Sequence, residues 1–217
     1  MNLLELKDAF RIRADDNTGL KLWSDEEIIL YLNEAEQESA ERALLIQDET
    51  TPAVCQIPLL TTTGVYPLHE SVLAIMRAKP ELSDKLVITS RETMDRGWPG
   101  WETATGTPQY LFENGDGNIT IVPIPVVADT LKLAVKRLPL TKMAADIDTP
   151  EIPARYHYRM LDWALRCAYL KQDAEVFDKQ AAASYEVAFE RSFGYRHDSN
   201  VQRKQRDKSP RVTQSNW

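Results

Sequence analysis

The spacing of the apolar residues changes twice along the chain, and this change constrains the fold more than any other feature. Up to about residue 49, apolar residues recur every three or four positions, as on one face of an α-helix. Residues 50–145 contain short β-rich runs separated by proline and turn residues, and helical spacing returns over residues 146–194. The order predicts an α+β fold: the outer helices form an antiparallel helical bundle with an inserted small β module.

The clearest helix start is Ser24-Asp25-Glu26-Glu27. Ser24 can accept the amide hydrogen of Glu27 while the Glu27 side chain reaches back to the Ser24 amide, which is a capping box. A short helix over residues 3–13 is expected before it. The helix that follows the box is expected to continue to about Ile46. Its buried face carries residues at helical spacing: Ile28, Leu32, Ala35, Ser39, Ala43 and Ile46.

The other face of the same helix is acidic. It carries Glu26, Glu34, Glu38 and Glu41. One interpretation is a solvated face, and the other is a subunit interface at which Glu34, Glu38 and Glu41 receive a basic segment.

Six segments of the middle region are candidate strands, among them VCQIPLL and TLKLAVKRL. The clearest hairpin is PQYLFE-NGDGN-ITIVP, because its glycines can adopt positive φ in the turn. In TLKLAVKRL, apolar residues alternate with lysines, so one face of that strand is expected to be buried. The loop Trp98-Pro99-Gly100-Trp101 has two interpretations: a satellite core, or a contact with a neighbouring subunit through Trp98 and Trp101.

Helical patterns return after Asp148-Thr149-Pro150-Glu151-Ile152-Pro153, where acids and prolines mark a helix start. A first helix is expected over residues 154–171 and a second over 174–193, with Asp173 as the cap of the second. Gly194 is suited to end it.

The last segment, residues 195–217, differs in character from the rest. It has six basic residues against two acidic ones, whereas the whole chain has a net charge of −7. With so few apolar residues it cannot offset its own ordering entropy, so we expect an extended arm. The residues expected to bind a partner are Arg196, Arg203, Lys204, Arg206, Lys208, Arg211 and the terminal aromatic anchor Trp217.

The composition excludes several classes of function. No run of 18 apolar residues is present, so no membrane span is predicted, and the charged N-terminus lacks the apolar block of a signal peptide. Cys55 and Cys167 are expected to be reduced core residues. The three histidines lack metal-ligand spacing, and no nucleophile, phosphate-binding or dinucleotide motif occurs. The sequence therefore predicts no enzyme activity, no cofactor and no metal.

Three stretches together resemble a known family. WSDEEIILYLNEAEQESAERA resembles the opening helix of the head-to-tail adaptor, or connector, proteins of tailed bacteriophages. GTPQYLFENGDGNITIVPIP with TLKLAVKRLPL resembles their middle β region, and DTPEIPARYHYRMLDWALRCAYLKQDAEVFDKQAAASYEVAF resembles their closing helix pair. The resemblance covers about residues 23–193.

The resemblance implies a virion structural protein that is made in the host cytoplasm and located in the neck. Family members form a ring, usually a dodecamer, beneath the portal protein, and a tail protein (nozzle or tail tube) docks below. DNA passes through the lumen without specific binding. The pattern along the chain divides it into N-terminal helices of the bundle (1–49), an inserted β module (50–145), a C-terminal helix pair (146–194) and an extended basic arm (195–217). The resemblance implies that this arm binds the portal protein.

Two other functions remain open at the level of sequence. One is a neck or tail-completion protein without portal contact. The other is a nucleic-acid-binding module that uses the basic tail, for which a steep loss of affinity with salt is the signature.

Overall fold

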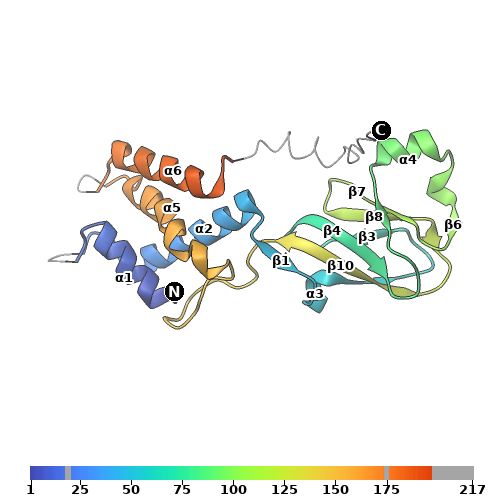
Figure 1. Cartoon of the computed structure of the whole chain (residues 1–217), viewed down its shortest axis with the longest axis horizontal. Helices are drawn as coiled ribbons and strands as arrows, with labels where there is room; N and C mark the ends of the chain where they lie inside the picture. The colour runs from blue at the N-terminus through green and yellow to red at the C-terminus, as the bar shows by residue number, and fades with distance from the viewer. Residues whose placement is uncertain (18–20, 174–175, 197–217) are drawn as a thin grey trace, which may run out of the picture. The chain divides into compact units, whose positions relative to one another are not determined.

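The computed structural model describes residues 1–17, 21–173 and 176–196, and it shows a mixed α+β protein (Figure 1). The chain divides into two compact units. We call residues 1–46 and 137–196 the helical unit, and residues 47–136 the β unit. The chain therefore passes from one unit to the other twice.

Four helices form most of the helical unit, and they lie together in Figure 1. They are α1 (Leu3–Arg13), α2 (Asp25–Ala43), α5 (His157–Tyr169) and α6 (Lys179–Phe193), with a short 3-10 turn, η2 (Ala154–Tyr156), before α5. α5 packs against the other three helices. The core that they enclose contains Phe10, Trp23, Leu32, Leu161 and Phe189, all nearly inaccessible to solvent.

The ends of these helices follow from local capping. The predicted box is confirmed: Ser24 accepts the Glu27 amide hydrogen and Glu27 accepts that of Ser24. α2 ends at Ala43, earlier than predicted, because Leu44 turns into the left-handed region (φ 48°). The predicted cap at Asp173 is wrong, since the Asp178 carboxylate accepts the amides of Gln180 and Ala181 and α6 begins there.

The β unit contains ten short strands, two short helices and one 3-10 turn, counting β1 and β10, which cross its boundaries. The strands are β1 (Ile46–Asp48), β2 (Gln56–Leu59), β3 (Val65–Pro67), β4 (Val72–Pro80), β5 (Val87–Ile88), β6 (Thr105–Gly106), β7 (Tyr110–Glu113), β8 (Asn118–Val122), β9 (Ile124–Pro125) and β10 (Asp129–Arg137). The helices are α3 (Pro52–Cys55), α4 (Arg91–Gly97) and η1 (Trp101–Thr103). The prediction of a strand over VCQIPLL is wrong in its first two residues, which belong to α3.

Three sheets arise from these strands. One has the order β1-β10-β2 with β4 also paired to β10, the second has the order β3-β8-β7-β5, and β6 pairs with β9. The predicted hairpin is confirmed as the antiparallel pair β7–β8, with Tyr110 opposite Val122. Its turn uses positive φ at Gly115 (80°) and Gly117 (83°). The alternation in β10 is also confirmed, because Leu131, Leu133 and Val135 enter the main core of the β unit and Lys132 is exposed.

Candidate assembly surfaces

The C-terminal arm leaves the helical unit from a fixed point. α6 ends at Phe193, which is buried against Phe189 (ring centroids 4.5 Å apart) and Tyr156 (5.6 Å). Gly194 follows with φ 87°, a conformation that residues other than glycine rarely adopt. Its carbonyl oxygen accepts a hydrogen bond from Nη1 of Arg42 (3.3 Å). The first residue after α6 is thus held by α2.

Arg42 is the centre of this anchor. Its Nε donates to the Glu38 carboxylate at 2.8 Å, and both side chains are at least nine-tenths buried. The Arg42 guanidinium also lies over the rings of Trp163 (4.8 Å) and Phe189 (5.0 Å). A buried cation needs such partners, because removing it from water without them costs several kcal/mol.

Glu38 serves two cations. Its Oε1 lies 3.7 Å from Nε of Arg196, the last residue that the structure describes. Arg196 is therefore placed at the root of the arm on the helical unit, and Tyr195 beside it is three-quarters exposed. The other predicted arm residues, Arg203, Lys204, Arg206, Lys208, Arg211 and Trp217, lie outside the described part of the chain.

The three glutamates of the predicted acidic row have different surroundings. Glu38 is buried in the pair just described. Glu34 is exposed, although its Oε1 accepts from Nε1 of Trp163 (3.1 Å) and Sγ of Cys167 (3.5 Å). Glu41 is half-buried and has no ion pair with any residue that the structure describes. The row therefore does not act as one uniform surface.

The tryptophan loop folds onto the β unit. Trp101 is 6% exposed, packs edge-on against Phe112 (5.2 Å) and donates from Nε1 to Asp95 (2.8 Å). Trp98 is partly buried against Tyr110 (6.2 Å). Within the described chain, these rings form the satellite core that the sequence offered as one of two interpretations.

Sequence reasoning missed a buried carboxylate in α2. Glu36 is 1% exposed and accepts the backbone amide hydrogen of Glu151 at 2.5 Å. Burial raises the pKa of Glu36 to about 7. The available signal was its spacing, four residues after Leu32 and three before Ser39, which places it on the buried face of α2.

The carboxylate of Glu151 accepts hydrogen bonds from three residues. It accepts from Arg137 (2.6 Å) and from the amides of Leu140 (2.7 Å) and Thr141 (2.9 Å). Burial acts to raise the pKa of Glu151, but the Arg137 guanidinium and the two amides hold it below its ordinary value. The segment after β10 is thereby fastened to α2.

The remaining candidate groups have structural partners. His157 is buried between the Met1 ammonium group (3.0 Å from Nδ1) and the Ile152 carbonyl oxygen (2.8 Å from Nε2). Burial raises the pKa of the Cys167 thiol to about 12, and neither cysteine is bridged, as predicted. Among residues 1–17, 21–173 and 176–196, no group of three His, Cys, Asp or Glu residues could hold a metal ion. No helix in the same ranges is long and apolar enough to cross a membrane.

The comparison with protein families identifies the kind of protein that carries these surfaces. The family model described as SU10 adaptor protein matches residues 1–214, almost the whole chain. The chain belongs to this family. It is therefore a head-to-tail adaptor, a structural protein of a tailed bacteriophage. No curated protein matches the chain.

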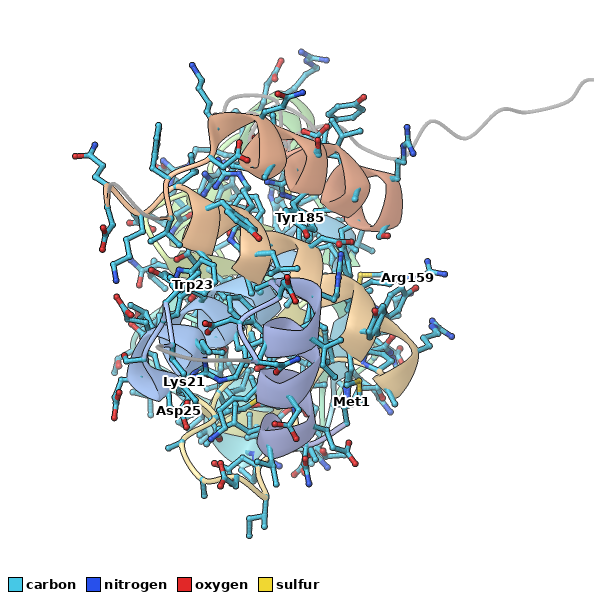
Figure 2. The ribbon with its side chains drawn as sticks, turned by 90° about the vertical axis from the view of Figure 1, so that its left-hand side faces the viewer. Met1, Lys21, Trp23, Asp25, Arg159 and Tyr185 are labelled. Carbon is cyan, nitrogen blue, oxygen red and sulfur yellow. The ribbon has the colours of Figure 1, made fainter. Side chains whose placement is uncertain are left out.

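The match to the SU10 adaptor family begins before α1 and extends beyond α6, so it includes both units and most of the arm. Figure 2 looks onto the helical unit of this adaptor and labels Trp23 and Tyr185, which both pack against Tyr169 of α5 (5.6 and 5.8 Å between ring centroids). A phage adaptor belongs in the neck of the virion.

Proposed function

We propose that this adaptor forms a ring, a dodecamer, beneath the portal protein and docks a tail protein on its other side. Residues 1–49 and 146–194 would supply an antiparallel helical bundle as the body of each subunit, residues 50–145 the β module, and residues 195–217 the portal-binding arm. DNA would pass through the lumen without specific binding, and the protein would act by assembly rather than by catalysis.

The observation that carries the proposal is the set of contacts at the root of the arm. The Glu38–Arg42 pair, the carbonyl oxygen of Gly194 and the side chain of Arg196 come together at the end of α6. Because the arm starts from a position held by these contacts, its basic residues can meet a partner only within a restricted volume. In a ring, twelve such arms would bind one partner with effectively intramolecular steps after the first.

The affinity of each arm for the portal protein would come from its basic residues and from Trp217. Arg203, Lys204, Arg206, Lys208 and Arg211 would meet carboxylates of the portal protein and raise the association rate. Trp217 would fill a pocket, and Trp217→Ala is expected to cost about 2 kcal/mol or more of binding free energy per arm.

The direct test is deletion of residues 197–217, which spares Arg196 and its contact with Glu38. The truncated chain should keep the helical circular-dichroism signal of the full chain and lose binding to the portal protein of the same phage. The matched control replaces Arg203, Lys204, Arg206, Lys208 and Arg211 with glutamine and retains Trp217, which separates charge from the anchor.

Two outcomes would contradict the proposal. Wild-type portal affinity after the deletion would favour a neck or tail-completion protein whose arm has another role. A steep, salt-dependent affinity of the full chain for DNA, lost on deletion, would instead favour a nucleic-acid-binding module.

A further inference from the structure

One face of the β unit carries an unusual share of its basic residues. Residues 47–136 contain seven basic and eleven acidic residues, so the unit is acidic. Four of the seven basic residues nevertheless lie on the neighbouring strands β4 and β10, which pair with each other (Figure 1). They are Arg77 and Lys79 on β4, and Lys132 and Lys136 on β10.

These residues face away from the core. In β10, Leu131, Leu133 and Val135 are buried in the core of the β unit, so the intervening Lys132, Ala134 and Lys136 point to the opposite face. Arg77, Lys79, Lys132 and Ala134 line a groove of about 420 Å³ on this face, together with Glu49, Pro80, Glu81 and Leu133. We call this surface the basic groove.

Two of the three cations that line the basic groove are free to bind a partner. The third, Lys132, is paired with Glu81 at 2.8 Å. Lys136, on the same strand but not among the lining residues, is 3.4 Å from the amide oxygen of Gln47. Arg77 and Lys79 are exposed, and neither has an ion pair with the part of the chain that the structure describes. The groove therefore attracts carboxylates.

α2 presents a surface with the complementary character. Its more exposed side is a stripe at helical spacing: Glu26, Leu30, Glu34 and Gln37, which are exposed, and the half-buried Glu41. Leu30, which lies between Glu26 and Glu34, is 62% exposed. Glu26 and Glu41 have no ion pair with any described residue. We call this surface the acidic stripe.

We propose that the basic groove of one copy binds the acidic stripe of α2 of a second copy, as the lateral contact of the ring. This rests on the proposed ring-forming function. The two surfaces are different and lie on different units, which is what a closed ring of identical subunits requires, since each interface joins one face to another.

The composition of the groove favours a protein surface over nucleic acid. Glu49 and Glu81 are among its lining residues and would repel phosphates, and no aromatic residue is available to stack on bases. A face that mixes both charges instead suits a partner with a matching pattern.

The test uses two charge-reversed forms of the full chain. One carries Arg77→Glu and Lys79→Glu in the groove, and the other carries Glu26→Lys and Glu41→Lys in the stripe. Each form alone should lose ring formation with the portal protein, because like charges then meet at every interface, and association should weaken about tenfold or more. An equimolar mixture should recover an even-numbered ring in which the two forms alternate.

The matched control carries Asp8→Lys and Lys85→Glu, which reverse two exposed charges outside both surfaces. It should form rings like the wild type, measured for all forms by native mass spectrometry.

If the wild type forms rings but the mixture of the two charge-reversed forms does not, this inference is overturned and the proposed function is left intact. Failure of the wild type to form any ring would overturn both. Rings that survive the Arg77 and Lys79 changes while DNA binding is lost would assign the groove to nucleic acid and overturn the inference.

Discussion

The helical unit and the β unit use their charged residues in opposite ways. In the helical unit, Arg11–Asp16 (2.6 Å), Arg42–Glu38 (2.8 Å) and Arg137–Glu151 (2.6 Å) are buried or largely buried pairs. In the β unit, Arg96–Glu92 and Lys132–Glu81 are pairs of exposed side chains, and the cations of the basic groove face solvent.

The difference indicates that the two sets of charges have different roles. The buried pairs of the helical unit hold its helices and the root of the arm in place, so altering them should change stability. The exposed charges of the β unit contribute little to its fold, so altering them should change binding instead.

Removing Arg42 should have the largest effect on stability. Arg42→Ala leaves Glu38 buried without its main cation and uncovers Trp163 and Phe189, so we expect a loss of about 3–5 kcal/mol in the free energy of unfolding. Arg96→Ala in the exposed pair of α4 is the matched variant and should cost less than about 1 kcal/mol. Urea unfolding of both variants measures the two losses in the free energy of unfolding. Equal losses would contradict the difference between the two units.

Glu36 should give the helical unit a stability that depends on pH between about 4.5 and 7. Its ordinary pKa of 4.5 is raised to about 7 in the folded state. Between these values the folded chain holds a proton that the unfolded chain releases, so the free energy of unfolding falls as pH rises through this window, by up to about 3 kcal/mol.

Glu36→Gln should remove that slope while its side-chain oxygen still accepts the Glu151 amide. Unfolding at pH 5 and pH 8 measures it: the wild type should be less stable at pH 8, and the variant should change far less. A wild-type stability that rises over the same range would contradict the raised pKa.

Trp101 tests the satellite core of the β unit. Trp101→Phe keeps a ring against Phe112 but removes the indole hydrogen bond to Asp95, which should cost about 1 kcal/mol. Hydrogen exchange should increase around α4 and β7 and stay unchanged in α5. A ring-assembly defect with unchanged exchange would instead indicate that the loop contacts a neighbouring subunit.

The two thiols should show the smallest effect. Alkylation without reductant should label both Cys55 and Cys167 after unfolding. In the native chain Cys55, which is 1% exposed, should resist labelling. Mass spectrometry that finds neither thiol labelled after unfolding would show a bridge that the structure does not contain.

The sequence predicted the features that depend on local chemistry. The Ser24 capping box, the β7–β8 hairpin and the alternation in β10 are each specified by neighbouring residues, and each is found. The prediction for the cap of α6 is wrong because the sequence offers two aspartates, Asp173 and Asp178, and the helix begins at the second.

The candidate site was harder to predict because it depends on contacts between distant segments. Glu38 and Arg42 are four residues apart, which predicts an ordinary surface pair. Their burial follows from Trp163 and Phe189, more than 100 residues later in the chain. The basic groove likewise needs β4 and β10 to be adjacent, which no local pattern in either strand indicates.

Ring formation on contact with the portal protein can be tested by one mass measurement. Native mass spectrometry or light scattering would compare the purified chain alone with the chain mixed with the portal protein of the same phage. We expect monomers or weak oligomers alone, and a ring of twelve copies bound to the portal in the mixture. A chain that stays monomeric and unbound in the presence of the portal would contradict this expectation.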